Sequence, residues 1–144
     1  MVTSYIAAGR YTTTLFIWSG DALHLTSTGV VEVSEAGRGG ISCSTYCSLT
    51  IEGHVISHAG TGIGLGHGGS TTVGSAGLIY GYQFGAHTGY GNILINHGAI
   101  AGVSAGGGIG VLVGASSVVE NHGAIFGAVI GVAMEDRGRT INDG

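Results

Sequence analysis

The chain has 144 residues with 31 glycines, no proline, 8% charged residues and a formal net charge of −4. This composition excludes collagen, intrinsic disorder and a helical bundle, because Pro is absent, 44% of the residues are hydrophobic and Gly destabilises helix interiors. Since only four side chains are cationic, all of them Arg, we expect no nucleic-acid partner.

Residues 1–20 precede the sequence repeat described below, and we expect them to form an N-terminal cap or docking strand. Residues 12–18 are rich in β-branched and aromatic side chains, which favour a strand. We predict that five residues of this run form one of the two ends through which copies of the chain associate. They are Thr12, Leu15, Phe16, Ile17 and Trp18.

Residues 21–144 are organised by a sequence repeat. Its clearest copies, residues 93–102 and 118–127, share the sequence Asn-His-Gly-Ala-Ile, and weaker copies are centred on Gly29, Gly53 and Gly77. The copies recur every 21 to 25 residues. This period, combined with β-branched residues and Gly corners, is typical of a β-solenoid. We therefore predict an all-β, single-domain parallel β-solenoid (β-helix) with about 23 residues per coil and about five coils.

Alignment of the copies on their glycine predicts which side chains stack in the core. The positions four residues before and two residues after the Gly are mostly branched and apolar, and their even separation places them on one side of an extended chain. The two predicted core columns are Leu25, Leu49, Val73, Leu94 and Val119, and Val31, Val55, Ile79, Ile100 and Ile125. Two residues before the Gly, Asn96, Asn121 and Asn142 predict a structural column whose amides bond the coils above and below.

The Asn-x-Gly-x-Ile coils resemble those of bacterial secreted β-solenoids, namely autotransporter passengers, filamentous adhesins and the N-terminal regions of RTX-type secreted proteins. Residues 20–31 are similar to the first coil of such proteins, and the resemblance covers about residues 20–144. It implies a bacterial extracellular or cell-surface location. The calcium-binding nonapeptide is missing, because residues 62–69 contain no Asp at the ligand position, so we expect neither a metal nor a cofactor.

The repeat stops in the middle of its motif at Gly144, without a polar block that would cap it. We expect an open end there, because unpaired strand edges pair with other chains. Either the chain associates end to end or it is a piece of a longer solenoid. End-to-end association would make it a homo-oligomer, a head-to-tail filament. At this end the predicted assembly residues are Thr140, Ile141 and Asn142.

Residues 98–119 offer a competing interpretation as a membrane helix. They carry no formal charge over 22 residues, and glycines recur four apart from Gly98 to Gly114, as on the packing faces of transmembrane helices. Three consecutive glycines at 106–108 disfavour a helix interior, however, and no Lys or Arg flanks the stretch. We therefore expect no membrane span.

Three groups of side chains stand out from the repeat. Cys43 and Cys47 are candidates for a small-loop disulfide, which fits an oxidising compartment, although two free thiols are the alternative. Four aromatic residues either form a face that binds surface polysaccharide or a partner chain, or fill a wider coil. They are Tyr80, Tyr82, Phe84 and Tyr90. A shared column of His97, His122 and Asp143 is interpreted as a polar corner rather than a metal site.

The carboxylates do not predict catalysis. Solenoid lyases and hydrolases need carboxylates clustered with each other or with Arg or Lys on one face. Here the carboxylates are scattered over different coils, and no Gly-x-Ser-x-Gly motif occurs. We therefore predict an extracellular structural or adhesive protein that self-associates, with no catalytic residues. The alternative is a carbohydrate-binding or carbohydrate-processing β-helix.

Overall fold

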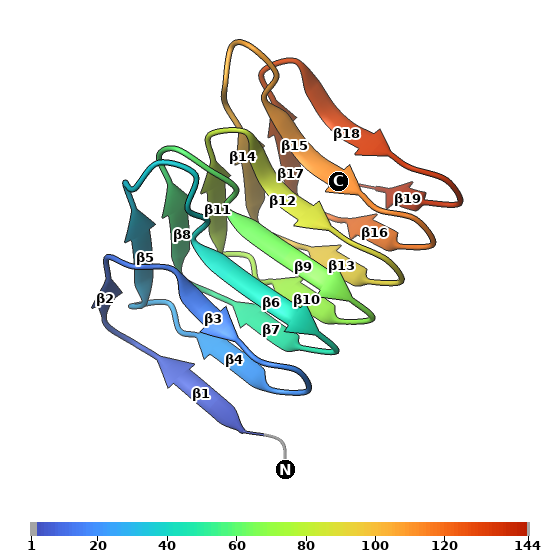
Figure 1. Cartoon of the computed structure of the whole chain (residues 1–144). Helices are drawn as coiled ribbons and strands as arrows, with labels where there is room; N and C mark the ends of the chain where they lie inside the picture. The colour runs from blue at the N-terminus through green and yellow to red at the C-terminus, as the bar shows by residue number, and fades with distance from the viewer. Residues whose placement is uncertain (1–2, 144) are drawn as a thin grey trace.

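The computed structural model describes residues 3–143, and every regular element in that range is a strand (Figure 1). The chain winds as a parallel β-solenoid of about six coils with about 23 residues per coil. Each coil contributes one strand to each of three sheets, here called A, B and C, and strands of successive coils pair in parallel. The predicted fold class is therefore confirmed.

The three sheets form the sides of the rod. Sheet A contains β1 (Ser4–Ala7), β4 (Ala22–Leu25), β7 (Ser48–Ile51), β10 (Ser70–Val73), β13 (Ile93–Asn96), β16 (Val118–Asn121) and β19 (Arg139–Asn142). Sheet B contains β2 (Arg10–Tyr11), β5 (Val30–Val33), β8 (His54–Ser57), β11 (Leu78–Gly81), β14 (Ala99–Gly102) and β17 (Ala124–Gly127). Sheet C contains β3 (Leu15–Ile17), β6 (Ile41–Thr45), β9 (Ile63–His67), β12 (Phe84–Thr88), β15 (Ile109–Val113) and β18 (Ile130–Met134).

The core is a set of inward-facing columns that run the length of the rod. Because side chains alternate along a strand, every second residue is buried and successive coils place equivalent residues beside each other. Leu94 pairs with Val119 across β13 and β16, as the repeat predicts. The predicted column in sheet B is also found, and its members in register are Val31, Val55, Ile79, Ile100 and Ile125.

The predicted core column of sheet A is wrong at two positions, Leu25 and Val73. The inward positions that line up with Leu49 are Leu23 on β4 and Thr71 on β10. Leu25 and Val73 lie two residues further along, in the column that continues into the three asparagines. The cause is corner length, because β4 and β10 are followed by corners of four residues, whereas β7, β13 and β16 are followed by corners of two. Counting back four residues from the corner Gly therefore assigns Leu25 and Val73 to the wrong column. Both residues are nevertheless buried in the core.

The solenoid begins one coil earlier than the repeat indicates. Residues expected to form a cap or docking strand instead form β1, β2 and β3, which pair with β4, β5 and β6. This coil is short, since Ser4 pairs with Ala22 only 18 positions away, and it has no Asn-x-Gly-x-Ile motif. It raises the number of coils from the expected five to about six.

Residues 98–119, considered above as a membrane helix, form β14, β15 and the beginning of β16. Within residues 3–143, no helix has the length and apolar character needed to cross a membrane.

The corner that leads from sheet C to sheet A turns through a left-handed residue in every coil. The residues with positive φ there are Gly20, Tyr46, Gly68, Gly91, Ser116 and Arg137. An L-residue in this conformation is strained by its Cβ, whereas Gly is not. Three of the six coils nevertheless use a residue other than Gly.

Gly91→Ala is expected to lower the free energy of unfolding by about 1 kcal/mol. The φ of Gly91 is +67°, while an added Cβ would meet nothing within 4 Å, so the loss would come from the backbone alone. The matched reverse change is Ser116→Gly, where φ is 57° and a gain of similar size is expected. Urea unfolding followed by circular dichroism measures both, and two changes of the same sign would contradict this explanation.

Candidate functional site

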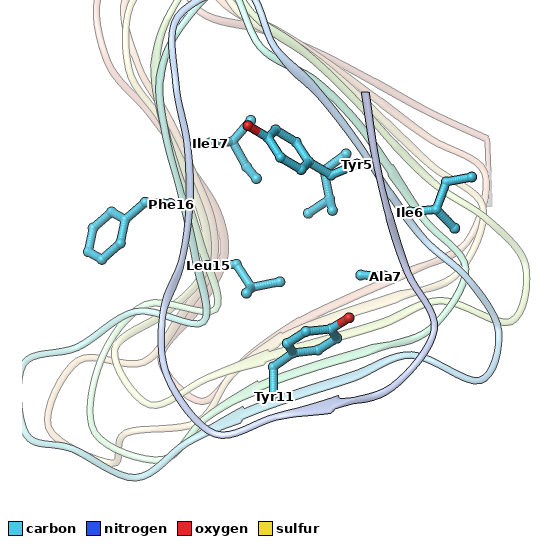
Figure 2. A pocket seen from close by; sticks show the side chains of 8 residues that line it. Tyr5, Ile6, Ala7, Tyr11, Leu15, Phe16 and Ile17 are labelled. Carbon is cyan, nitrogen blue, oxygen red and sulfur yellow. The ribbon is translucent and has the colours of Figure 1, made fainter. Parts of the chain in front are cut away.

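The N-terminal end of the rod is an open apolar pocket of about 290 Å³. It is lined by Tyr5, Ile6, Ala7, Tyr11, Leu15, Phe16, Ile17 and Leu23. Figure 2 shows Tyr5, Tyr11 and Leu15 directed into the interior of the coil, whereas Ile6 and Phe16 point outward. Strands β1, β2 and β3 each form the outer edge of their sheet among residues 3–143, so the pocket is surrounded by unpaired backbone groups.

The structure brings the five N-terminal candidates for assembly into this first coil. Leu15 and Ile17 face the interior and line the pocket. Phe16 and Trp18 face outward, with 54% and 68% of their surface exposed. Thr12 is exposed in the corner between β2 and β3.

The C-terminal end is the second open surface of the rod, formed by β17, β18 and β19, the opposite edges of the three sheets. Ile125 on β17 is partly exposed, whereas its neighbour one coil earlier, Ile100, is 1% exposed. The predicted assembly residues lie on β19, where Thr140 and Ile141 are half-buried and Asn142 is exposed. Both ends of the rod therefore expose interior side chains and strand edges.

The three asparagines form a hydrogen-bonded ladder along sheet A. Asn96 donates from Nδ2 to Oδ1 of Asn121 at 2.7 Å, and Asn121 donates to Oδ1 of Asn142 at 2.6 Å. The same side chains bind the corner backbone, because the amide N–H of Gly98 donates to Asn96 at 3.1 Å and that of Gly123 to Asn121 at 3.4 Å. Asn96 and Asn121 are buried, so the ladder satisfies polar groups inside the rod.

Cys43 and Cys47 are joined by a disulfide in the structure, at the end of β6 and the corner that follows it. Both sulfurs belong to residues that are at most 4% exposed. The alternative of two free thiols is therefore not what the structure contains.

The four aromatic candidates do not form one face. Tyr80, Tyr82 and Phe84 lie along β11, β12 and the corner between them, whereas Tyr90 follows the other end of β12. Tyr90 lies six positions after Phe84 and beyond the end of β12, so up to about 20 Å of extended chain separates the two residues. The structure therefore divides the aromatic residues between two corners.

Aromatic side chains also gather at the corner between sheets C and A, which sequence analysis missed. Tyr90, 57% exposed, lies 6.4 Å from the ring of His67. Tyr46, 72% exposed, covers the Cα of Gly68, where an added Cβ would come within 2.6 Å of the ring. Trp18, Tyr46 and Tyr90 are all exposed at this corner, in the first, second and fourth coils, and these three residues are here called the aromatic corner.

The column of His97, His122 and Asp143 is an exposed polar corner. The two imidazole rings are stacked 4.9 Å apart, and Nδ1 of His122 lies 2.5 Å from Oδ1 of Asp143. No group of three or more His, Cys, Asp or Glu side chains in the described part of the chain is arranged to hold a metal ion.

Glu32 on β5 is the centre of a charged group near the N-terminal end. Its Oε1 accepts a hydrogen bond from Nε2 of His58 at 3.0 Å, and Oε2 bonds the Arg10 guanidinium. The hydrogen bond from His58, followed by the charge of Arg10, lowers the pKa of the Glu32 carboxyl below its ordinary value of 4.5. The ionised carboxylate therefore links the first three coils.

Glu32→Gln is expected to lower the unfolding midpoint at pH 7. Because the pKa of Glu32 is lowered in the folded chain, its stabilisation is present above the unfolded value and is lost as the pH falls through the folded value. The difference from the wild type should therefore shrink below about pH 4.5. Urea unfolding from pH 7 to pH 3 tests this, with Glu35→Gln as control, since Glu35 contacts only Arg38 as an ion-pair partner in the described residues. A pH-independent difference would contradict the expectation.

Comparisons of the chain with protein-family models, with curated proteins and with solved structures found no match.

Proposed function

We propose that the chain is an extracellular structural or adhesive rod that either associates end to end with copies of itself or forms part of a longer solenoid. The observation that carries this proposal is that, within residues 3–143, three strands at each end of the rod lack a pairing partner on one side, and those at the N-terminal end surround an apolar pocket. Such edges pair readily with another chain. Contact between two rods would repeat the parallel pairing that joins successive coils within one rod.

The energetic benefit of association is the burial of the apolar ends. Burial of apolar surface contributes about 25 cal/mol per Å², and the pocket at the N-terminal end is lined mainly by apolar side chains. Contact between two different ends is heterologous, so each bound copy presents a new free end and growth continues into a filament.

Two observations support a bacterial extracellular or cell-surface location as part of this proposal. The Cys43–Cys47 disulfide is typical of proteins from oxidising compartments. The Asn-x-Gly-x-Ile coils resemble those of bacterial secreted solenoids, and their asparagines form the ladder described above.

The test is assembly of the purified full chain. Light scattering and negative-stain electron microscopy should show filaments of constant width whose length grows with protein concentration. Tyr5→Lys places a charge in the open pocket and should suppress growth, whereas Thr72→Lys, an outward position in the middle of sheet A, should not. A monodisperse monomer at high wild-type concentration would refute self-association.

Binding of a surface polysaccharide is a second candidate function, and the aromatic corner favours it. Exposed aromatic rings present apolar faces with polar tips, which suit sugar rings. A glycan array with the wild type should give binding that the double change Tyr46→Ala and Tyr90→Ala removes. The control Tyr82→Ala, at the other corner, should bind the same sugars as the wild type. An array on which the wild type binds no sugar would exclude this candidate function.

A further inference from the structure

We infer that Tyr46, His67 and Tyr90 form a platform that binds an uncharged polysaccharide lying along the axis of the rod. This inference rests on the second candidate function, binding of a surface polysaccharide at the aromatic corner. It specifies which side chains hold the sugar, which class of polysaccharide they accept and how long the bound segment is. The three residues, together with Gly68, are here called the ring platform.

The ring platform extends over three successive coils. The turns after β6, β9 and β12 follow one another along one edge of the rod (Figure 1). The backbone amide of Tyr46 donates to the carbonyl of His67 at 2.7 Å, and that of Gly68 donates to the carbonyl of Tyr90 at 2.9 Å. These bonds join each corner to the next, so the backbones of Tyr46 and Tyr90 are two coil spacings apart, about 9.6 Å.

Both tyrosine rings lie against the coil between them. A Cβ at Gly68 would come within 2.6 Å of the Tyr46 ring, so the missing side chain leaves the room that this ring occupies. The ring of Tyr90 is centred 6.4 Å from the imidazole of His67. Tyr46 and Tyr90 are 72% and 57% exposed. The rings are therefore supported by the coil between them while most of their surface is open to solvent.

The backbone at Tyr46 indicates that this ring has a use at the surface. Its φ is 53°, a left-handed conformation that strains an L-residue, whereas the equivalent positions of the two adjacent coils are Gly20 and Gly68. Tyr46 lies inside the short loop that the Cys43–Cys47 disulfide closes, so the cross-link restrains this conformation. Strained residues that the surrounding structure holds in place are concentrated at binding sites.

The chemistry of the ring platform selects an uncharged sugar chain. Tyrosine and imidazole rings offer apolar faces to the C–H groups of sugars, and their hydroxyl and N–H groups offer hydrogen bonds at the edges. The corner segments 44–48, 66–70 and 89–92 contain no Asp, Glu, Lys or Arg. Because the chain has a formal net charge of −4, an acidic polysaccharide would be repelled and would find no cation at this corner.

The extent of the ring platform sets the length of the bound segment. The platform spans three coils, which is more than one sugar ring covers. In an extended polysaccharide, sugars two units apart are separated by a distance similar to that between Tyr46 and Tyr90. A trisaccharide segment that runs along the rod therefore reaches across the platform, whereas a monosaccharide contacts only part of it.

The first experiment identifies the polysaccharide and measures its affinity for the full chain. An array of glucans, mannans, galactans and polyuronates should show binding to an uncharged polysaccharide only. Titration calorimetry with its oligosaccharides should show affinity rising about tenfold or more from the monosaccharide to the trisaccharide. Tyr46→Ala and Tyr90→Ala should each lower the affinity for the trisaccharide by about tenfold, whereas Tyr82→Ala should leave it unchanged.

A matched pair of glycine changes tests whether the position of the Tyr46 ring matters. Gly68 and Gly91 have φ values of +66° and +67°, so alanine strains the backbone equally at both. Only at Gly68 does the added Cβ meet the Tyr46 ring, since at Gly91 it meets nothing within 4 Å. Both changes should lower the urea midpoint by similar amounts, but only Gly68→Ala should weaken sugar binding. Equal affinities in the two variants would overturn the inference.

Tyr46→Gly separates binding from stability. It removes the ring and relieves the left-handed strain, so the urea midpoint should rise while the affinity for the trisaccharide falls. Unchanged affinity in this variant would overturn the inference.

The outcomes distinguish the inference from the candidate function beneath it. A preference for polyuronates, or an affinity that does not depend on oligosaccharide length, would overturn the ring platform but leave polysaccharide binding intact. If Tyr46→Ala weakens association between copies and leaves sugar binding unchanged, the platform is an interface between copies and the inference is wrong. An array on which the wild type binds no sugar would refute both.

Discussion

Asn121→Ala is expected to lower the free energy of unfolding by about 3 kcal/mol, because it interrupts the ladder at its centre. Asn121 is 5% exposed and bonds Asn96 on one side and Asn142 on the other. Its removal also leaves the amide N–H of Gly123 without its side-chain acceptor. Unfolding in urea, followed by circular dichroism, measures the loss.

The matched control is Asn142→Ala at the exposed end of the same ladder. There the change removes one bond at a solvent-accessible position, so a loss of about 1 kcal/mol is expected. The double change of Asn96 and Asn121 to Ala should cost less than the sum of the single changes, since the two side chains share a hydrogen bond. Equal losses at Asn121 and Asn142 would show that burial of the ladder contributes nothing.

The asparagine ladder is one of two kinds of side chain that occupy the same inward column of sheet A. Its column begins with the apolar residues Ala7, Leu25, Ile51 and Val73 and changes to amides from β13 onward. In the apolar part, the corner amide of Gly53 donates to the carbonyl of Leu25 in the coil below. In the amide part, side-chain oxygens accept from the corner instead. An amide is therefore an alternative corner cap rather than a requirement of the fold.

The sequence predicts the coils well where the corner length is constant. The sheet B column is correct because the corner Gly directly precedes its strand, so the count of two residues to the buried position never changes. The sheet A column fails at Leu25 and Val73 because their corners contain two additional residues. Alternation along a strand cannot reveal this, since a shift of two residues keeps the same face inward.

Sequence analysis identifies residues at the ends of the rod but does not predict how these residues are arranged in space. The run around Phe16 and Trp18 is recognisable as a strand, but its coil has no Gly-centred motif, so its place in the stack was not readable. The aromatic corner was missed for a related reason. Tyr46 lies seven residues before Gly53 and Tyr90 eight residues before Gly98, so the two do not share one column of the repeat. The corner after sheet C, with its recurring left-handed residues, places both at one edge of the rod.

Gly98→Ala is expected to destabilise the rod by about 3 kcal/mol, through crowding of neighbouring coils. A Cβ at Gly98 would lie 2.3 Å from the carbonyl oxygen of Gly77 and 2.4 Å from that of Gly74. Both are backbone atoms of the preceding coil, which cannot move without disturbing the parallel pairing of sheets A and B. The midpoint of urea unfolding and its slope measure the loss.

Gly106→Ala is the matched control, because it is the same substitution in the same coil. Its added Cβ would meet only the Ser104 hydroxyl, at 3.9 Å, so a change within about 0.5 kcal/mol is expected. Comparable losses at Gly98 and Gly106 would attribute the effect to backbone flexibility rather than to crowding.

The crowding at Gly98 recurs at the equivalent corners and explains the most regular signal in the sequence. A Cβ would lie 2.1 Å from a backbone oxygen of the previous coil at Gly53 and 2.2 Å at Gly123. Coils separated by about 4.8 Å leave no room for a side chain where one corner passes directly over another. Gly123→Ala is therefore expected to resemble Gly98→Ala in cost.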